Sequence, residues 1–216
     1  MANRVLIYFG CLIILGGCIY KEEPMPGIVY SPQPEPKIVQ PKIVKPTTPA
    51  KIEGISKNIP GGWFPPSRLE KDWSAIIIHH SATTNGNADI FDKWHRQGNY
   101  WEGVGYDFVI GNGTDSDDGQ VEVTFRWRQQ VTGAHCKTPN NWANENAVGI
   151  CLVGNFNDTV PTARQLQSLA QLVRFLQSRY KIPKSRIYGH NTTPGARSTD
   201  CPGKRFPMSR LKSMFD

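Results

Sequence analysis

Three residues that can bind a metal ion lie far apart in the sequence. His79 ends an apolar run that starts at Ala75, His190 ends a second run that starts at Arg186, and Cys201 follows eleven residues later. Two imidazoles and one thiolate provide three ligands for a tetrahedral zinc and leave the fourth position for water. An open position is typical of a catalytic zinc, which brings its bound water to a pKa near neutrality. The three residues therefore predict a zinc hydrolase.

The first ligand has an adjacent alternative. In a strand over 75–80, His79 shares a face with Ile77, whereas His80 shares the opposite face with Ile78. Only one of the two imidazoles can point into a given cleft, and periodicity does not choose between them. The other imidazole is expected to pack in the core or to support a ligand.

The elements that must position these residues alternate between strand and helix patterns. Strand-like apolar runs occur at 75–80, 106–111, 121–125, 148–153 and 186–190. Alternation of this kind predicts an α/β fold, with a mixed central β-sheet flanked by helices in a single domain over 61–216. The length of this segment is sufficient for a core of its own.

Three helices are expected between or after the strands. Asn87 is a plausible N-cap of a helix that ends near Gly98. Thr162 and Gln165 form a capping box, which opens a long helix with an apolar stripe at spacings of three and four. A short helix is expected after Pro207.

The N-terminal segment has the pattern of an export signal. Residues 1–18 combine a basic start with an apolar stretch too short to span a bilayer comfortably, and they end in small residues before Cys18. This end resembles the lipobox of bacterial lipoproteins, which implies a signal peptide and lipidation at Cys18. An ordinary secretory signal or an uncleaved anchor is the alternative. Each interpretation predicts that the domain leaves the cytoplasm, either as an envelope protein anchored through Cys18 at an outer membrane or the cell surface, or as a periplasmic or secreted protein. Ile19 after the cysteine disfavours retention at an inner membrane in a cell with two membranes.

Residues 19–60 are expected to form a tether between this signal and the domain. Proline recurs along the segment, and a five-residue unit repeats between Pro36 and Pro46. Repeated proline keeps a chain extended at roughly 3 Å per residue. We interpret the segment as a passive spacer.

Charge restricts the possible partners. The chain carries a net charge of +7, of which Arg4 contributes +1 and the tether, with six Lys and four Glu, contributes +2. The remaining +4 on 61–216 is compatible with an anionic wall polymer and too small to indicate nucleic acid. No nucleic-acid-binding motif and no oligomerisation pattern accompanies it, so a monomer is expected.

Five segments in order resemble one family, the zinc N-acetylmuramoyl-L-alanine amidases that share a fold with peptidoglycan recognition proteins and certain phage lysozymes. The matching segments are Ile77-Ile-His-His-Ser-Ala-Thr83, Val104-Gly-Tyr-Asp-Phe-Val-Ile110, Gly133-Ala-His135, Asn146-Ala-Val-Gly-Ile-Cys-Leu-Val-Gly-Asn-Phe156, and Gly189-His190 with Thr199-Asp-Cys-Pro-Gly203. Each segment alone is weak evidence, and five in order are specific. The resemblance covers roughly residues 75 to 205 and implies peptidoglycan or muropeptides as the substrate.

The resemblance also implies a set of ligands. It selects His79 rather than His80 and adds His190 and Cys201 as ligands of Zn²⁺. The interval between His190 and Cys201 is longer than in the shorter phage enzymes and recognition proteins. Some relatives use aspartate as the third ligand, so the adjacent Asp200 is an alternative to Cys201.

Catalytic and substrate-binding residues follow from the same resemblance. Tyr106 occupies the position of the family's catalytic tyrosine, whose phenol hydrogen-bonds the attacking water or the oxyanion. Thr199 occupies a position held by threonine or lysine in catalytic members. His135 and Asn146 lie in segments that resemble the floor of the peptidoglycan groove, although His135 as a structural histidine is an equal alternative.

Two other classes of protein compete with the zinc amidase. One is a non-catalytic peptidoglycan-binding module on the same fold, and the other is a cysteine peptidase that uses Cys201 with His190. The presence of all three ligands together with Tyr106 favours the amidase. Two further expectations concern packing: Trp94 and Trp101 are interpreted as core residues, and Cys151 as a buried thiol that could pair with Cys136.

Overall fold

A computed structural model describes residues 59–215 of the chain. The expected signal peptide with Cys18, and all but the last two residues of the expected tether, lie outside the described residues. The predictions for these segments therefore stay predictions.

A five-stranded mixed sheet forms the centre of the domain, with strand order β3-β2-β4-β1-β5. Its strands are β1 (Ala75–His80), β2 (Phe108–Ile110), β3 (Val121–Val123), β4 (Ala147–Leu152) and β5 (Ile187–Gly189). β1 pairs in parallel with β4 and β5, β2 pairs in parallel with β4, and β3 is antiparallel to β2. The five predicted strands and the mixed sheet are confirmed, and β1 and β4 are buried along their whole length.

The three predicted helices also form, with the predicted caps. Helix α1 (Ala88–Asn99) begins after Asn87, whose side chain accepts a hydrogen bond from the Ile90 amide. Helix α4 (Ala163–Tyr180) begins with the capping box of Thr162 and Gln165. Helix α5 (Met208–Ser213) follows Pro207.

Two short helices were not predicted from the sequence. They are α2 (Phe125–Gln129) and α3 (Trp142–Asn146), each of five residues. One and a half turns are too short to show a helical periodicity. Four 3₁₀ turns complete the described elements: η1 (Gly61–Trp63), η2 (Pro139–Asn141), η3 (Lys184–Arg186) and η4 (His190–Thr192).

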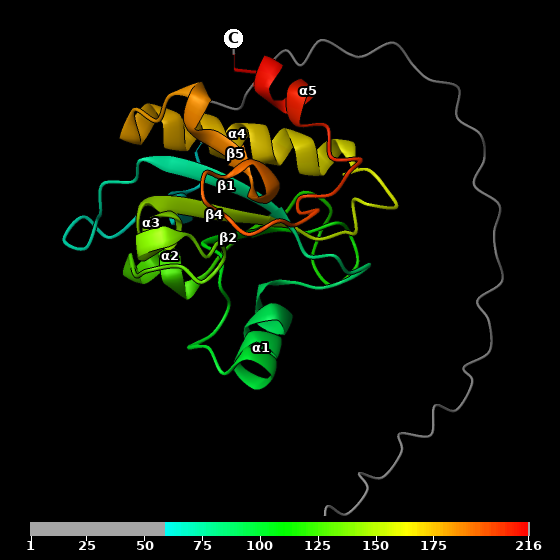
Figure 1. The fold of residues 1–216 in the computed structure, drawn as a ribbon, viewed down its shortest axis with the longest axis horizontal. Coiled ribbons are helices and arrows are strands. Elements are labelled where there is room, and N and C mark those ends of the chain that lie inside the picture. The colour runs from blue at the N-terminus through cyan, green and yellow to red at the C-terminus, as the bar shows by residue number, and fades with distance from the viewer. Residues whose placement is uncertain (1–58, 216) are drawn as a thin grey trace, which may run out of the picture. The chain divides into compact units, whose positions relative to one another are not determined.

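Helices cover the two faces of the sheet differently. Figure 1 shows α4 lying along one face, with α5 beside it, and α1 on the opposite side. The side chains of Ile76 and Ile78 pack in the main hydrophobic core with Leu169 and Leu176 of α4. Because side chains alternate along a strand, Ile77 and His79 point to the other face, away from α4. Within 59–215 no helix combines the length and apolar character needed to cross a membrane.

Candidate metal centre

His79 lies near the carboxyl end of the central strand β1, between β4 and β5. Its side chain is 1% exposed. His190 directly follows the carboxyl end of the neighbouring strand β5. Since the two strands are parallel, their carboxyl ends meet at the same edge of the sheet. The imidazole ring centroids of His79 and His190 are 4.7 Å apart.

Cys201 joins the two imidazoles from the loop after η4. One ligand atom each from His79, His190 and Cys201 lies within 4.8 Å of the other two. The Sγ atom of Cys201 is 3.5 Å from Nδ1 of His79. Tetrahedral zinc with ordinary Zn–N and Zn–S bond lengths places such a pair about 3.6 Å apart. The donor types and this separation therefore fit a zinc ion.

The chemistry of the Cys201 thiol also fits a metal ligand. Burial raises the pKa of Cys201 to about 12, so the thiol keeps its proton at neutral pH in the absence of a cation. Its Sγ accepts a hydrogen bond from the His80 amide at 3.4 Å. A free nucleophilic cysteine needs a lowered pKa, whereas a bound metal ion deprotonates a thiol directly. This environment favours the metal site over the cysteine peptidase.

The two alternative ligands have other partners. The Nδ1 atom of His80 accepts a hydrogen bond from the Phe156 amide at 3.0 Å. The carboxylate of Asp200 is exposed and lies 3.5 Å from the Lys204 ammonium. Neither residue belongs to a group of possible ligands in the described part of the chain.

The two candidate histidine ligands are neutral at neutral pH. Burial is the main cause that lowers the pKa of His79, far below the ordinary value, and nearby His135 and His190 lower it further. Burial also lowers the pKa of His190. A neutral imidazole keeps one nitrogen lone pair free for a metal.

Tyr106 lies beside this cluster, just before β2. Its ring centroid is 5.2 Å from that of His79, and its hydroxyl interacts with the Cys151 thiol. Burial, followed by the nearby thiols, raises the pKa of Tyr106 well above its ordinary value. The phenol therefore keeps its proton over the whole neutral range and can act as a hydrogen-bond donor.

Thr199 is half-buried and lies two residues before the cysteine. Its Oγ1 atom accepts a hydrogen bond from the Cys201 amide at 3.2 Å. The hydroxyl proton is thus not used in this contact and can be donated to another group.

The structure separates the two expected substrate-binding residues. His135 lies next to the metal ligands, because its Nδ1 atom is 3.0 Å from Nε2 of His79. Asn146 is exposed at the end of α3, where its Nδ2 donates to the Trp142 carbonyl oxygen. It precedes Cys151, the residue paired with His79, by five positions, or about 16 Å along the strand. The structure therefore does not bring Asn146 to the metal ligands.

A row of aromatic rings leads from Tyr106 through His95 and Trp101 to the surface. The sequence pattern does not single out His95, and it led to the interpretation of Trp101 as a core residue. His95 of α1 accepts a hydrogen bond from the Gly105 amide at Nδ1, and its ring centroid is 5.7 Å from that of Tyr106. The Trp101 ring follows at 5.0 Å from His95. Trp101 is 40% exposed, and Trp94 is exposed as well, so their interpretation as core residues was wrong. A core aromatic and an exposed one near a site have the same local sequence pattern.

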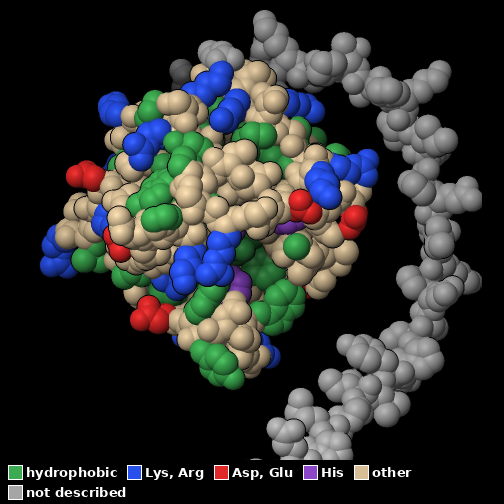
Figure 2. Space-filling model, viewed as in Figure 1, with side chains coloured by type: hydrophobic (Ala, Val, Ile, Leu, Met, Phe, Trp, Pro, Cys, Tyr) green, Lys and Arg blue, Asp and Glu red, His purple; other side chains and the backbone are tan. Residues whose placement is uncertain are grey.

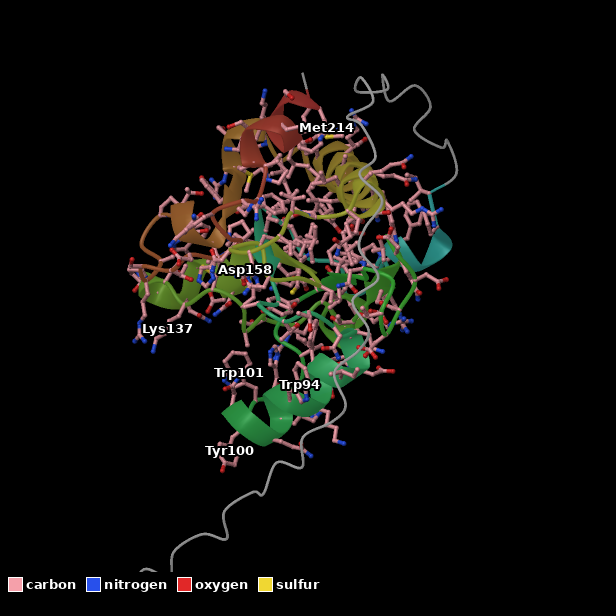
Figure 3. The ribbon with its side chains drawn as sticks, turned by 90° about the vertical axis from the view of Figure 1, so that its right-hand side faces the viewer. Trp94, Tyr100, Trp101, Lys137, Asp158 and Met214 are labelled. Carbon is pink, nitrogen blue, oxygen red and sulfur yellow. The ribbon has the colours of Figure 1, made fainter. Side chains whose placement is uncertain are left out.

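The figures show the surroundings of this row. Figure 2 shows histidine surface in a hollow between basic and hydrophobic side chains. In Figure 3 the side chains of Trp94, Tyr100 and Trp101 surround α1, and Lys137 projects from a different part of the domain. Exposed aromatic and basic side chains are thus available on the surface of this domain.

The remaining cysteines of the domain are free thiols. Cys136 and Cys151 are both buried, and they pack in two different hydrophobic clusters. The structure thus agrees with the interpretation of Cys151 as a buried thiol and shows no bond between the two residues.

The fold and the site together define a class of protein: an α/β domain in which the carboxyl ends of two parallel strands and a following loop bring two histidines and a cysteine together, in position for a metal ion. Comparison with known proteins identifies the family. The family model "Amidase_2: N-acetylmuramoyl-L-alanine amidase" matches residues 69–204. The chain belongs to this family. Solved structures similar to the chain include an amidase and a peptidoglycan recognition protein.

Three relatives illustrate the similarity. Peptidoglycan-recognition protein SC2 of Drosophila melanogaster is 31% identical over 160 residues, which cover 69% of this chain and 79% of the relative. The structure of the N-acetylmuramoyl-L-alanine amidase LysC from Clostridium intestinale has a TM-score of 0.57 and 30% identity, covering 67% of this chain and 85% of LysC. A mutant of Drosophila PGRP-LB in complex with tracheal cytotoxin has a TM-score of 0.50 and 25% identity, covering 66% of this chain and 84% of PGRP-LB.

Proposed function

We propose that this chain is a zinc-dependent N-acetylmuramoyl-L-alanine amidase. It would hydrolyse the amide bond between the lactyl group of N-acetylmuramic acid and L-alanine in peptidoglycan or muropeptides. One observation carries the proposal: the donor atoms of His79, His190 and Cys201 come together beside the hydroxyl-bearing ring of Tyr106. Membership of the amidase family and the similarity to LysC support it.

The chain's own residues take distinct roles in this reaction. His79, His190 and Cys201 would hold a zinc ion, which supplies a Lewis acid and an activated water when it is bound. Tyr106 donates its phenolic proton to the carbonyl oxygen of the scissile amide as negative charge develops there. This hydrogen bond is stronger in the transition state than in the ground state, so it accelerates the reaction.

Thr199 assists from the loop that carries Cys201, two residues before the cysteine. Because its Oγ1 atom accepts the Cys201 amide, the hydroxyl group has a fixed position next to a metal ligand. Its free proton can then orient the attacking water or the tetrahedral intermediate. No carboxylate among residues 59–215 belongs to the group of possible ligands, so the proposed metal site consists of His79, His190 and Cys201.

The substrate and the location follow from the same proposal. Proteins similar to this chain include recognition proteins for peptidoglycan, one of them a mutant in complex with tracheal cytotoxin. We propose that this chain acts on such wall material from the bacterial cell envelope, as a monomer held by a lipid on Cys18. The segment 19–60 would then be the spacer between the membrane and the domain.

The test uses the full chain, purified in detergent without added metal. Bound zinc is quantified, and the zinc-loaded protein is incubated with purified peptidoglycan while newly freed L-alanine amino termini are measured. One zinc per chain and release that EDTA abolishes would support the amidase. Binding to the wall without release would instead identify a recognition module, and release by metal-free protein would refute the zinc mechanism.

A further inference from the structure

We propose that His135 is a positioning residue for the metal ligand His79: it fixes the orientation and the tautomer of that imidazole and does not bind the substrate through its ring nitrogens. The proposal rests on the zinc site proposed above. It gives His135 a role different from the substrate contact implied by the family resemblance.

The first step is the assignment of protons along a chain of hydrogen bonds. The Nε2 atom of His135 is 3.2 Å from the Ala147 carbonyl oxygen, which can only accept. Nε2 of a neutral His135 therefore carries the proton, and its Nδ1 is an acceptor. Since Nδ1 is 3.0 Å from Nε2 of His79, the His79 nitrogen must be the donor in this pair.

The second step concerns the other nitrogen of His79. With its proton on Nε2, a neutral His79 has its lone pair on Nδ1. This is the atom 3.5 Å from the sulfur of Cys201, which belongs with His79 to the group of possible ligands. The backbone carbonyl of Ala147 thus determines, through His135, which nitrogen of His79 faces the metal position. Partners of this kind are common for metal-binding histidines.

The third step concerns the contacts that fix the orientation of the His135 ring. Asn144 Oδ1 accepts hydrogen bonds from the amides of His135 and Cys136, both at 2.8 Å. The ring lies against two glycines: a Cβ atom would be 2.5 Å from the ring at Gly149 and 2.6 Å at Gly133. Neither glycine can be replaced without moving the ring, so the sequence leaves space for one orientation.

Burial decides between positioning and substrate binding. The His135 side chain is 7% exposed, and both of its ring nitrogens already have partners in the protein. A substrate group would have to break one of these hydrogen bonds to reach a ring nitrogen. The geometry therefore favours the role in the metal site.

The experiment compares two isosteric substitutions in the full chain. An asparagine side chain can place an amide oxygen where His135 has Nδ1, and a glutamine side chain can place its amide nitrogen near the position of Nε2. His135→Asn therefore keeps the acceptor for His79, whereas His135→Gln keeps only the donor to Ala147. The control is His95→Leu, which removes a half-buried imidazole that accepts the Gly105 amide and packs against Trp101 and Tyr106, and not against His79, His190 or Cys201.

Zinc affinity is measured by competition with a chelator, and thermal unfolding is followed for each variant. Loss of an outer partner of a metal-binding histidine typically weakens metal affinity by about tenfold to a hundredfold. We expect this loss in His135→Gln, a smaller loss in His135→Asn, and unchanged affinity in His95→Leu. At saturating zinc, KM for a muropeptide should stay at the wild-type value in His135→Asn.

The outcomes separate this proposal from the proposed function. If the wild-type chain binds no zinc, the proposed function itself fails. If the wild type binds zinc and His135→Gln binds it equally well, the positioning role is refuted. A raised KM at saturating zinc with unchanged zinc affinity would instead assign His135 to the substrate.

Discussion

Replacing Tyr106 by phenylalanine removes a single oxygen atom from the proposed active site. The ring keeps its packing against His79 and His95, so the change isolates the hydroxyl group. In the free protein this group interacts with the Cys151 thiol, and losing such a neutral hydrogen bond costs about 1 kcal/mol in stability. In the transition state the same group would donate to an oxyanion, and losing one such donor costs about 3 kcal/mol.

The loss of the donor to the oxyanion decides the expected change in activity, because it raises the activation barrier of the reaction. We expect Tyr106→Phe to lower kcat on the order of a hundredfold, while the zinc content stays at one ion per chain. The raised pKa of Tyr106 adds an expectation for the pH profile. Since the phenol keeps its proton throughout the neutral range, its removal should lower the profile without moving either limb.

The assay is steady-state release of L-alanine amino termini from a defined muropeptide, at several pH values and at saturating zinc. Thermal unfolding of the same samples controls for folding. A variant with activity near that of the wild type would remove Tyr106 from the mechanism. A large loss of zinc would mean that the tyrosine supports the metal site rather than the chemistry.

The other predictions concern the metal ligand, a buried carboxyl group and the proposed anchor. Cys201→Ala should lose both zinc and activity, as measured by metal analysis and amide hydrolysis. If the variant retained stoichiometric zinc, Asp200 would be the third ligand instead. Burial raises the pKa of Asp107 to about 7. The folded protein thus holds a proton that the unfolded chain has released, so stability should fall as pH rises from about 4 to about 7. Asp107→Asn should flatten this part of the curve of melting temperature against pH. An unchanged slope would refute the assignment of this pH dependence to Asp107. Cys18→Ala should move the protein from the membrane fraction to the soluble fraction of the producing bacterium, and an unchanged distribution would refute the lipid anchor.

Much of the fold could be predicted because its signals are local. The Asn87 cap and the Thr162 capping box lie within four residues of the helices they start. The strand β1 shows a continuous apolar run because both of its faces are buried in a parallel arrangement. The short helices α2 and α3 lack such signals, since five residues cannot establish a period.

The ligand set shows where sequence information ends. That His79 and His190 meet could be expected, because both lie at the carboxyl ends of strands. The choice of His79 over His80 came from the family resemblance, and the structure gives it a physical reason. β1 lies between β4 and β5, and the alternation of its side chains turns His79 to the face opposite α4. The His80 side chain instead lies on the other face, where its Nδ1 accepts a hydrogen bond from the Phe156 amide.

The role of His135 could not be derived from the sequence for a related reason. Gly149 is 14 positions from His135 in the chain, and the contact between them depends on how β4 packs beside the segment that carries Gly133 and the histidine. Glycine at position 149 of a buried strand lowers the stability of that strand. The structure accounts for this cost, because the absent side chain makes room for the His135 ring between Ala147 and His79. The glycine thus serves the position of the His135 ring, and through it the proposed metal site, rather than the sheet. Gly149→Ala should accordingly weaken zinc binding more than it disturbs the pairing of β1 with β4.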